Sequence, residues 1–218
     1  MQVYISHLTS GDMISNSKAD NYKRCYGKNQ LKFGSKPVLI VIDCVKAYHD
    51  PKSPLYAPER FDIALKSIIR LIEKCRAVGI PVVYTSVIYE TPNAGGKWYT
   101  EKLPNVLCCY DAGNPFREFA EGVEPRKDEV VVLKQYSSSF FGTSLSSLLA
   151  SIGCDSTILC GYSTSGCVRA TGKSIMALLV KNTDESCLIS CSSRFYAIWI
   201  QSLRCAGSLW GSAPSCKR

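Results

Sequence analysis

The stretch that decides the fold is KPVLIVIDCV, residues 36–45. It is a nearly continuous run of apolar, largely β-branched residues, and it meets an acid at Asp43. Runs of this kind are typical of a strand that is buried on both faces within a parallel sheet. We therefore expect a parallel strand over 36–42 with Asp43 at its carboxyl end.

The chain beyond this strand alternates between helical and strand patterns. Apolar residues recur at three- and four-residue steps over 59–78, which predicts an amphipathic helix, and IPVVYTSV (80–87) predicts the next strand. The same patterns predict a strand at 128–134, a helix at 143–153, a strand at 156–162 and a helix at 166–180. Repeated alternation of this kind predicts an α/β fold, an open and mostly parallel sheet with helices on both faces.

One connection, residues 88–127, is too long to be a simple link and is rich in Gly, Pro, Asn and aromatic residues. Loops of this length usually line a functional site or a partner surface. Trp98, Tyr99 and Phe116 are therefore candidates for substrate contact. Because such aromatics more often pack the loop or a subunit contact, we assign none of them to the site.

The two ends differ from the middle of the chain. Residues 1–35 are polar and without periodicity, so we expect a loose extension before a domain at 36–180. Residues 181–218 form an atypical tail that has no acid after Glu185 and abounds in Ser, Cys, Arg and Trp. Its composition suggests an out-of-frame or unspliced end, although FYAIWIQSL (195–203) is compatible with a short strand or helix.

The formal net charge of +8 does not indicate a nucleic-acid partner. Residues 36–180 hold 16 basic and 14 acidic residues, so most of the excess lies in the two ends. A basic groove on the folded domain is therefore not expected. Several of the 12 cysteines lie in apolar, strand-like surroundings, which suggests reduced buried thiols. With no long apolar run and no leader-like start, we expect a cytoplasmic protein without a membrane partner.

Three chemically capable residues fall at the carboxyl ends of predicted strands: Asp43, Lys134 and, in the turn after the fourth strand, Cys167. Ligands of open α/β sheets bind at this edge. A nucleophilic cysteine needs activation, and a helix N-terminus with a nearby ammonium favours the thiolate while Asp43 could accept its proton. Taken alone, Cys167 could be a buried core thiol, Asp43 a capping acid and Lys134 a solvated amine. Their occurrence together at one edge of the sheet favours a catalytic site.

These residues resemble the isochorismatase-like cysteine hydrolases. The resemblance covers about residues 36–180 and is carried by LIVIDCVKAY (39–48), VVLKQYSSSFFGTSL (131–145) and GYSTSGCVRAT (161–171), the last most like the N-carbamoylsarcosine amidase branch. It implies that Cys167 attacks a linear amide or ureido carbonyl of a small molecule, that ammonia leaves, and that water hydrolyses the thioester, with Asp43 and Lys134 as partners.

The resemblance also implies a non-proline cis peptide at Tyr162-Ser163, with Thr164 as the family threonine of this turn. The backbone N–H groups of Ser163 and Cys167 would then bind the oxyanion. Nicotinamidases of the family hold a metal through an Asp and two His, a set that this chain lacks, so we expect no metal and no cofactor. Relatives commonly form dimers or tetramers, which implies a homo-oligomer.

Two other classes of function were considered beside the hydrolase. The atypical tail departs from the family, whose members continue with a further strand, an acidic loop and closing helices. A catalytically silent protein that acts by binding or assembly is therefore the alternative hypothesis. A nucleotide-dependent oxidoreductase is disfavoured, because no G-x-G-x-x-G follows the strand at 36–42.

Overall fold

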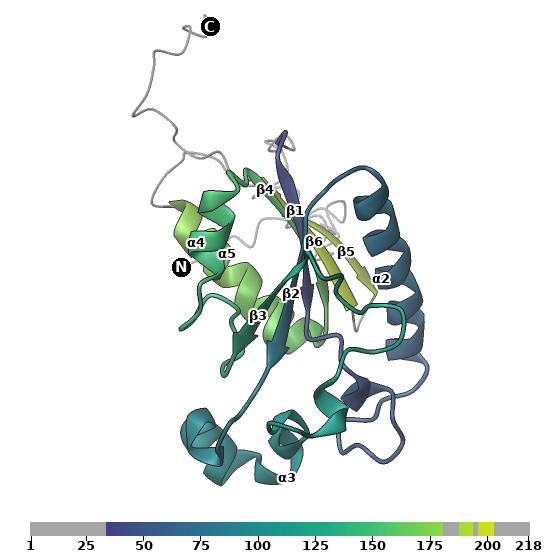
Figure 1. Ribbon diagram of the computed structural model, residues 1–218, viewed down its shortest axis with the longest axis vertical. Coiled ribbons are helices and arrows are strands. Elements are labelled where there is room, and N and C mark those ends of the chain that lie inside the picture. The colour runs from purple at the N-terminus through teal and green to yellow at the C-terminus, as the bar shows by residue number, and fades with distance from the viewer. Residues whose placement is uncertain (1–33, 181–187, 194–195, 203–218) are drawn as a thin grey trace, which may run out of the picture. The chain divides into compact units, whose positions relative to one another are not determined.

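The computed structural model describes residues 34–180, 188–193 and 196–202 (Figure 1). Its strands are β1 (Pro37–Ile42), β2 (Val82–Val87), β3 (Val130–Lys134), β4 (Ser156–Gly161), β5 (Leu188–Ser193) and β6 (Tyr196–Ser202). Its α-helices are α2 (Arg60–Ala77), α3 (Pro104–Leu107), α4 (Leu145–Ser151) and α5 (Arg169–Val180). Within the described residues, no helix combines the length and the apolar character that crossing a membrane requires.

The strands form one sheet in the order β3-β2-β1-β4-β6-β5. Strands β1 to β4 are parallel to their neighbours, with Ile40 opposite both Val83 of β2 and Leu159 of β4. β6 runs antiparallel to β4, and β5 antiparallel to β6. The prediction of an open, mostly parallel sheet is therefore confirmed.

Helices cover both faces of the sheet, with α2 on one side and α4 and α5 on the other (Figure 1). The alternation of side chains along β1 explains this arrangement, because successive residues of a strand point to opposite faces. Leu39 and Val41 pack in the core cluster that includes Ile72 of α2. Val38, Ile40 and Ile42 pack in the cluster that includes Leu145, Leu149 and Ile175 of α4 and α5. Because both faces of β1 are buried, its sequence is a continuous apolar run with no polar residue on either face.

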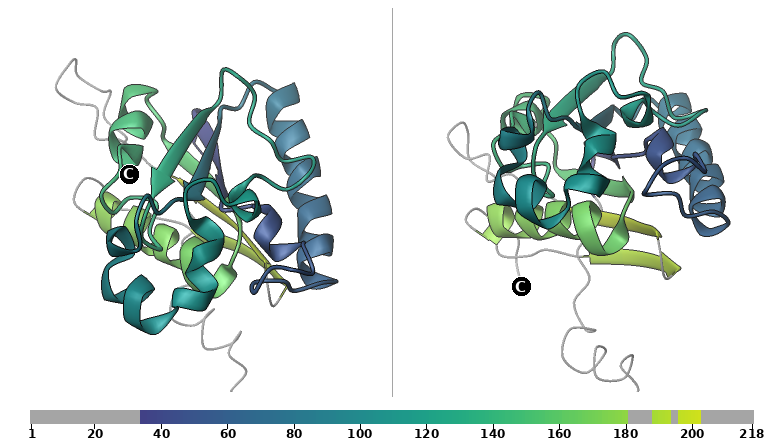
Figure 2. Two further views of the ribbon diagram at one scale, coloured as in Figure 1. Left: turned by 60° about the horizontal axis from the view of Figure 1, so that its bottom comes forward. Right: turned by 90° about the horizontal axis from the view of Figure 1, so that it is seen from below.

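The long connection contains a series of short helices and helical turns. They are Pro92–Gly95, Trp98–Lys102, α3, Cys108–Tyr110 and Pro115–Arg117. These turns gather beyond the carboxyl ends of β2 and β3, at the bottom of Figure 1 and towards the viewer in the right panel of Figure 2. The segment therefore lies at the edge of the sheet where the candidate residues were expected.

The ends of the chain are described only in part. Of the predicted extension, Gly34 and Ser35 are described, and their backbone N–H groups donate to Ser156 and Asp155. The rest of the extension lies outside the described residues. Of the atypical tail, β5 and β6 are described, and β6 falls within the segment for which a strand or a helix was left open. The remainder of the tail lies outside the described residues.

Candidate active site

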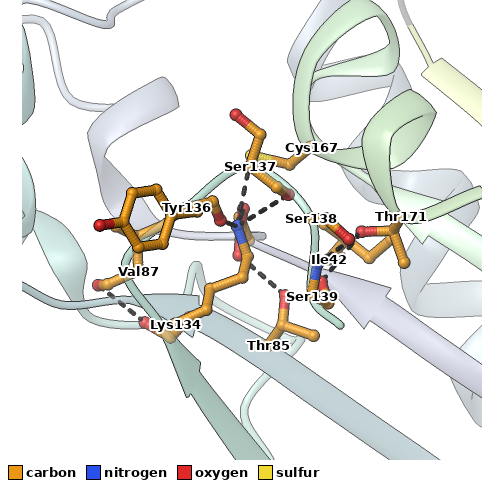
Figure 3. Close-up of polar contacts among 12 residues, drawn as sticks. Ile42, Thr85, Val87, Lys134, Tyr136, Ser137, Ser138, Ser139, Cys167 and Thr171 are labelled. Atoms are coloured by element: carbon orange, nitrogen blue, oxygen red, sulfur yellow. Dashed lines mark hydrogen bonds and ion pairs between the residues drawn. The ribbon is translucent and has the colours of Figure 1, made fainter. Parts of the chain in front are cut away.

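The structure brings Asp43, Lys134 and Cys167 together at the carboxyl edge of the sheet. The Lys134 Nζ atom lies 2.8 Å from Asp43 Oδ2 and donates a hydrogen bond of 3.4 Å to Cys167 Sγ. Asp43 follows β1 directly, Lys134 is the last residue of β3, and Cys167 lies in the turn between β4 and α5. Three segments far apart in the sequence therefore supply one cluster, and Figure 3 shows Lys134 and Cys167 within it.

Asp43 is held by both its backbone and its side chain. Its φ of 51° is left-handed, a conformation that Asp tolerates better than most residues. The carboxylate is fully buried, and Thr85 of β2 donates a hydrogen bond of 2.8 Å from Oγ1 to Oδ1. With Oδ1 occupied by Thr85, Oδ2 faces the Lys134 ammonium. Thr85 was not singled out from the sequence, although it lies near the end of a strand next to β1.

Lys134 is fully buried yet remains a cation. Besides Cys167, its ammonium donates to the backbone carbonyls of Tyr136 at 3.0 Å and Ser137 at 3.3 Å. Burial acts to lower the pKa of Lys134, but its interactions with Asp43 and Cys167 outweigh this effect, so the pKa is raised overall. The group is thus a fixed positive charge beside the sulfur.

Burial and two charged neighbours act on the ionisation of Cys167. Burial, together with the Asp43 carboxylate, raises the pKa of the thiol to about 12, although Lys134 acts to lower it. The Lys134 ammonium, expected to favour the thiolate, is therefore outweighed, and the transfer of the thiol proton to Asp43 stays a prediction. The physical reason is that loss of hydration and a nearby carboxylate disfavour the anion more than one ammonium favours it. Burial and the Asp43 side chain thus favour the protonated form of the thiol.

The turn that carries Cys167 has an irregular backbone. The Tyr162-Ser163 peptide bond is cis, as expected from the resemblance. Residues Thr164–Val168 form a single π-type turn with a non-helical Gly166, and α5 begins only at Arg169. The helix predicted to start at 166 therefore starts three residues later. Thr164 Oγ1 is buried, with no hydrogen-bond partner among the described residues.

Glycine is required at the end of β4. Gly161 has a φ of 133°, and a Cβ placed there would lie 2.0 Å from the carbonyl oxygen of Ile42. The strand that leads to the nucleophile turn can approach the end of β1 only without a side chain at this position. The contact brings the Cys167 turn close to Asp43.

A cavity of about 700 Å³ opens beside Cys167. Aromatic and aliphatic side chains make up most of its wall, and the lining residues carry no charged side chain within the described part of the chain. The ring-bearing lining residues are Tyr48, Tyr89, Trp98, Tyr110, Tyr136 and Phe141. Of the three aromatics considered from the sequence, only Trp98 lines the cavity. Tyr99 is buried against Asp111, and Phe116 packs on the core.

No group of three His, Cys, Asp or Glu side chains that could hold a metal ion occurs among the described residues. His49 Nδ1 lies 2.9 Å from Asp62 Oδ1. The backbone N–H groups of Ser163 and Cys167, expected at the oxyanion, belong to residues that both line the cavity.

Comparisons with known proteins find relatives both in sequence and in structure. The chain is 41% identical to maleamate amidohydrolase of Pseudomonas putida over 73% of its length and 74% of that protein. It is 31% identical to N-carbamoylsarcosine amidase of an Arthrobacter species over 69% of its length, but spans only 58% of that relative. A crystal structure of a cysteine hydrolase from Pseudomonas syringae pv. phaseolicola aligns with a TM-score of 0.60 at 26% identity, covering 69% of this chain and 72% of that one.

The N-carbamoylsarcosine amidase structure from Thermoplasma acidophilum aligns with a TM-score of 0.55 at 26% identity, covering 66% of this chain and 78% of that one. The family model described as the isochorismatase domain matches residues 37–178, which is well over half of the chain and contains every candidate site residue. The chain therefore belongs to the isochorismatase family.

Proposed function

We propose that this protein hydrolyses a linear, non-peptide amide or ureido C–N bond in a small molecule, with Cys167 as the nucleophile and release of ammonia. The observation that carries the proposal is the contact of one ammonium, 2.8 Å from a carboxylate and 3.4 Å from a thiol, beside a cavity. A nucleophile, a proton acceptor and an orienting charge within such distances are what acyl transfer through a covalent intermediate requires.

In the first half of the reaction, Asp43 takes the proton of the Cys167 thiol while the sulfur attacks the substrate carbonyl carbon. The raised thiol pKa makes this transfer necessary, because little thiolate is present beforehand. Lys134 stabilises the negative charge that develops on sulfur, since its ammonium contacts Sγ. The backbone N–H groups of Ser163 and Cys167 would stabilise the carbonyl oxygen as it becomes an oxyanion.

In the second half, the C–N bond breaks and Asp43 returns its proton to the leaving nitrogen, which departs as ammonia. A thioester between the acyl group and Cys167 remains. Asp43, again a carboxylate, takes a proton from water as the water oxygen attacks the thioester carbonyl. The C–S bond then breaks, the acid product leaves, and the sulfur regains a proton.

The choice of bond rests on relatives and on the cavity. Similar proteins are named for the hydrolysis of maleamate, N-carbamoylsarcosine and ureidoacrylate. The cavity volume lies in the range typical of small-molecule sites. The described cysteines are all free thiols, which supports a reducing compartment such as the cytoplasm as the place of action.

Ammonia release by the purified full chain tests the proposal. The panel should include maleamate, N-carbamoylsarcosine and uncharged amides, with each reaction compared to that of Cys167→Ala. We expect release with at least one substrate, and its loss in Cys167→Ala but not in Cys108→Ala, whose thiol is partly exposed and lies outside the cavity lining. Release that survives Cys167→Ala would contradict the mechanism, and binding without any release would favour a silent binding protein.

A further inference from the structure

The loop after β3 folds back over the ammonium of the residue that precedes it. Lys134 ends the strand, and within the next three residues two carbonyl oxygens, those of Tyr136 and Ser137, accept hydrogen bonds from Nζ. An ammonium has three N–H donors, yet four acceptors surround this one, because Asp43 and Cys167 also contact it. The position of the loop carbonyls therefore decides whether an N–H group of Lys134 is left to point at the Cys167 sulfur.

This loop is tied to the helix that follows Cys167 by a buried hydroxyl pair. The backbone N–H of Ser139 donates to Thr171 Oγ1 at 3.1 Å, and Thr171 Oγ1 donates to Ser139 Oγ at 3.0 Å (Figure 3). Both residues are fully buried. The threonine hydroxyl thus both accepts and donates, and it is the point at which α5 holds the loop two residues beyond the Ser137 carbonyl.

A second pair of hydroxyls strengthens the same connection. Ser138 Oγ and Ser174 Oγ lie 2.7 Å apart, and Ser174 also donates to the Ala170 carbonyl of its own helix. Cys167, Thr171 and Ser174 are spaced by four and then three residues, which places them along one side of the helical segment. Both anchors of the Lys134 loop therefore lie on α5, the helix that follows the Cys167 turn directly.

We infer that Thr171 is a positioning residue whose hydroxyl fixes the loop at 135–139, and thereby aims the Lys134 ammonium at the Cys167 sulfur. Ser174 supports it through Ser138. The effect of Thr171 on catalysis rests on the proposed function. Its effect on the position of the Lys134 ammonium relative to the Cys167 sulfur does not. Thr171 itself does not line the cavity, so it acts through Lys134.

A purely structural role for Thr171 predicts a different outcome. If Thr171→Val only loosened the fold, Cys167 would become more accessible and would react faster with an alkylating reagent. If Thr171 positions Lys134, its loss moves the ammonium away from sulfur, less thiolate forms, and alkylation slows. A change of one pKa unit in the thiol corresponds to about a tenfold change in its thiolate fraction.

The test measures iodoacetamide labelling of Cys167 by peptide mass spectrometry at pH 8, below the unfolding temperature of each variant, together with kcat and KM. Thr171→Val should slow Cys167 labelling about tenfold and lower kcat more than it changes KM. Thr171→Ser keeps the hydroxyl and should stay within about twofold of the wild-type rate, a difference of about 0.4 kcal/mol or less.

Thr157→Val is the matched control, because Thr157 is equally buried on β4 and its hydroxyl has no partner among the described residues. It should leave both labelling and turnover unchanged. If Thr171→Val does not fold, Ser174→Ala carries the test and should slow labelling in the same direction.

Labelling that is unchanged or faster in Thr171→Val, or slowed equally in Thr171→Ser, overturns the inference. Unchanged or faster labelling in Ser174→Ala does the same where that variant replaces Thr171→Val. The labelling readout needs no turnover, so it remains valid if no amide is hydrolysed. In that case the proposed function fails while slowed labelling still supports the positioning role of Thr171.

Discussion

The Lys134 ammonium and the Asp43 carboxylate lie 2.8 Å apart, and at most 1% of either side chain is exposed. The pair joins the ends of β3 and β1 across β2, at the edge where Cys167 lies. Removing one member of such a pair leaves the other charge buried without compensation. The same contact is therefore both a catalytic arrangement and a constraint on stability.

Lys134→Met should lower the free energy of unfolding by about 3–5 kcal/mol, because it leaves Asp43 buried beside no cation. The double variant Asp43→Asn/Lys134→Met should recover part of that loss, since neither charge then remains. Urea denaturation of the two single variants and the double variant measures the coupling. Additive effects of the two substitutions would contradict a coupled pair.

Thr85→Val should reduce kcat/KM about tenfold, because the hydroxyl that orients Asp43 Oδ1 is lost while the carboxylate remains. Asp43→Asn removes the proton acceptor itself and should reduce kcat/KM at least about a hundredfold. Steady-state ammonia release ranks the two variants against Thr157→Val, an isosteric change away from the site. Equal losses in Thr85→Val and Thr157→Val would show that Thr85 does not orient the base.

Stability should fall as the pH rises above about 9. Burial raises the pKa of Cys44, Cys160 and Cys167, so the folded chain keeps protons that the unfolded chain loses from about pH 8.5 to 9. The free energy of unfolding then declines by up to about 1.4 kcal/mol per pH unit for each such group, while below pH 8 these thiols contribute no slope.

Urea denaturation in the presence of a reductant at pH 8, 9, 10 and 11 measures this slope. Cys167→Ser removes one titrating thiol, so the decline in the free energy of unfolding should lose the contribution of that one thiol, up to about 1.4 kcal/mol per pH unit. A free energy of unfolding that is constant up to pH 11 would contradict the raised thiol pKa values.

Arg76→Lys should destabilise the fold by about 1–3 kcal/mol without affecting turnover. The guanidinium donates to both carboxylate oxygens of Glu129 at 2.8 and 2.7 Å, and to Tyr84 and the Glu124 carbonyl. A lysine cannot reproduce this geometry. Glu129 precedes β3, at the opposite end of the strand from Lys134, so kcat should stay within about twofold of wild type, a difference of about 0.4 kcal/mol or less. Thermal unfolding and ammonia release check the two parts separately.

The sequence was sufficient for the parts of the site that depend on strand ends. Asp43 and Lys134 follow from apolar runs that stop at a charge, and Cys167 from a turn motif after a third such run. Parallel strands bring these ends to one edge, so their proximity could be predicted without coordinates. The boundary of α5 was less accurate, because the turn through Gly166 interrupts the helix in a way that periodicity does not reveal.

Features that depend on tertiary packing were not predictable. The raised pKa of Cys167 results from burial and the nearby Asp43 carboxylate, and residue types alone do not reveal how deeply the thiol is buried. The contact from Thr85 to Asp43 and the pair of Thr171 and Ser139 depend on the register of strands and loops. Six of the residues that line the cavity come from the connection at 88–127, whose helical turns have no simple period.

Mass spectrometry of the protein trapped during turnover tests the central claim most directly. The full chain is mixed with an amide that it hydrolyses, quenched in acid within milliseconds to seconds, and digested to locate any added mass. We predict an acyl adduct on the peptide that contains Cys167, lost on treatment with hydroxylamine and absent from Cys167→Ser. Turnover with no adduct on Cys167 under conditions that trap thioesters, or ammonia release by Cys167→Ser at the wild-type rate, would contradict the account.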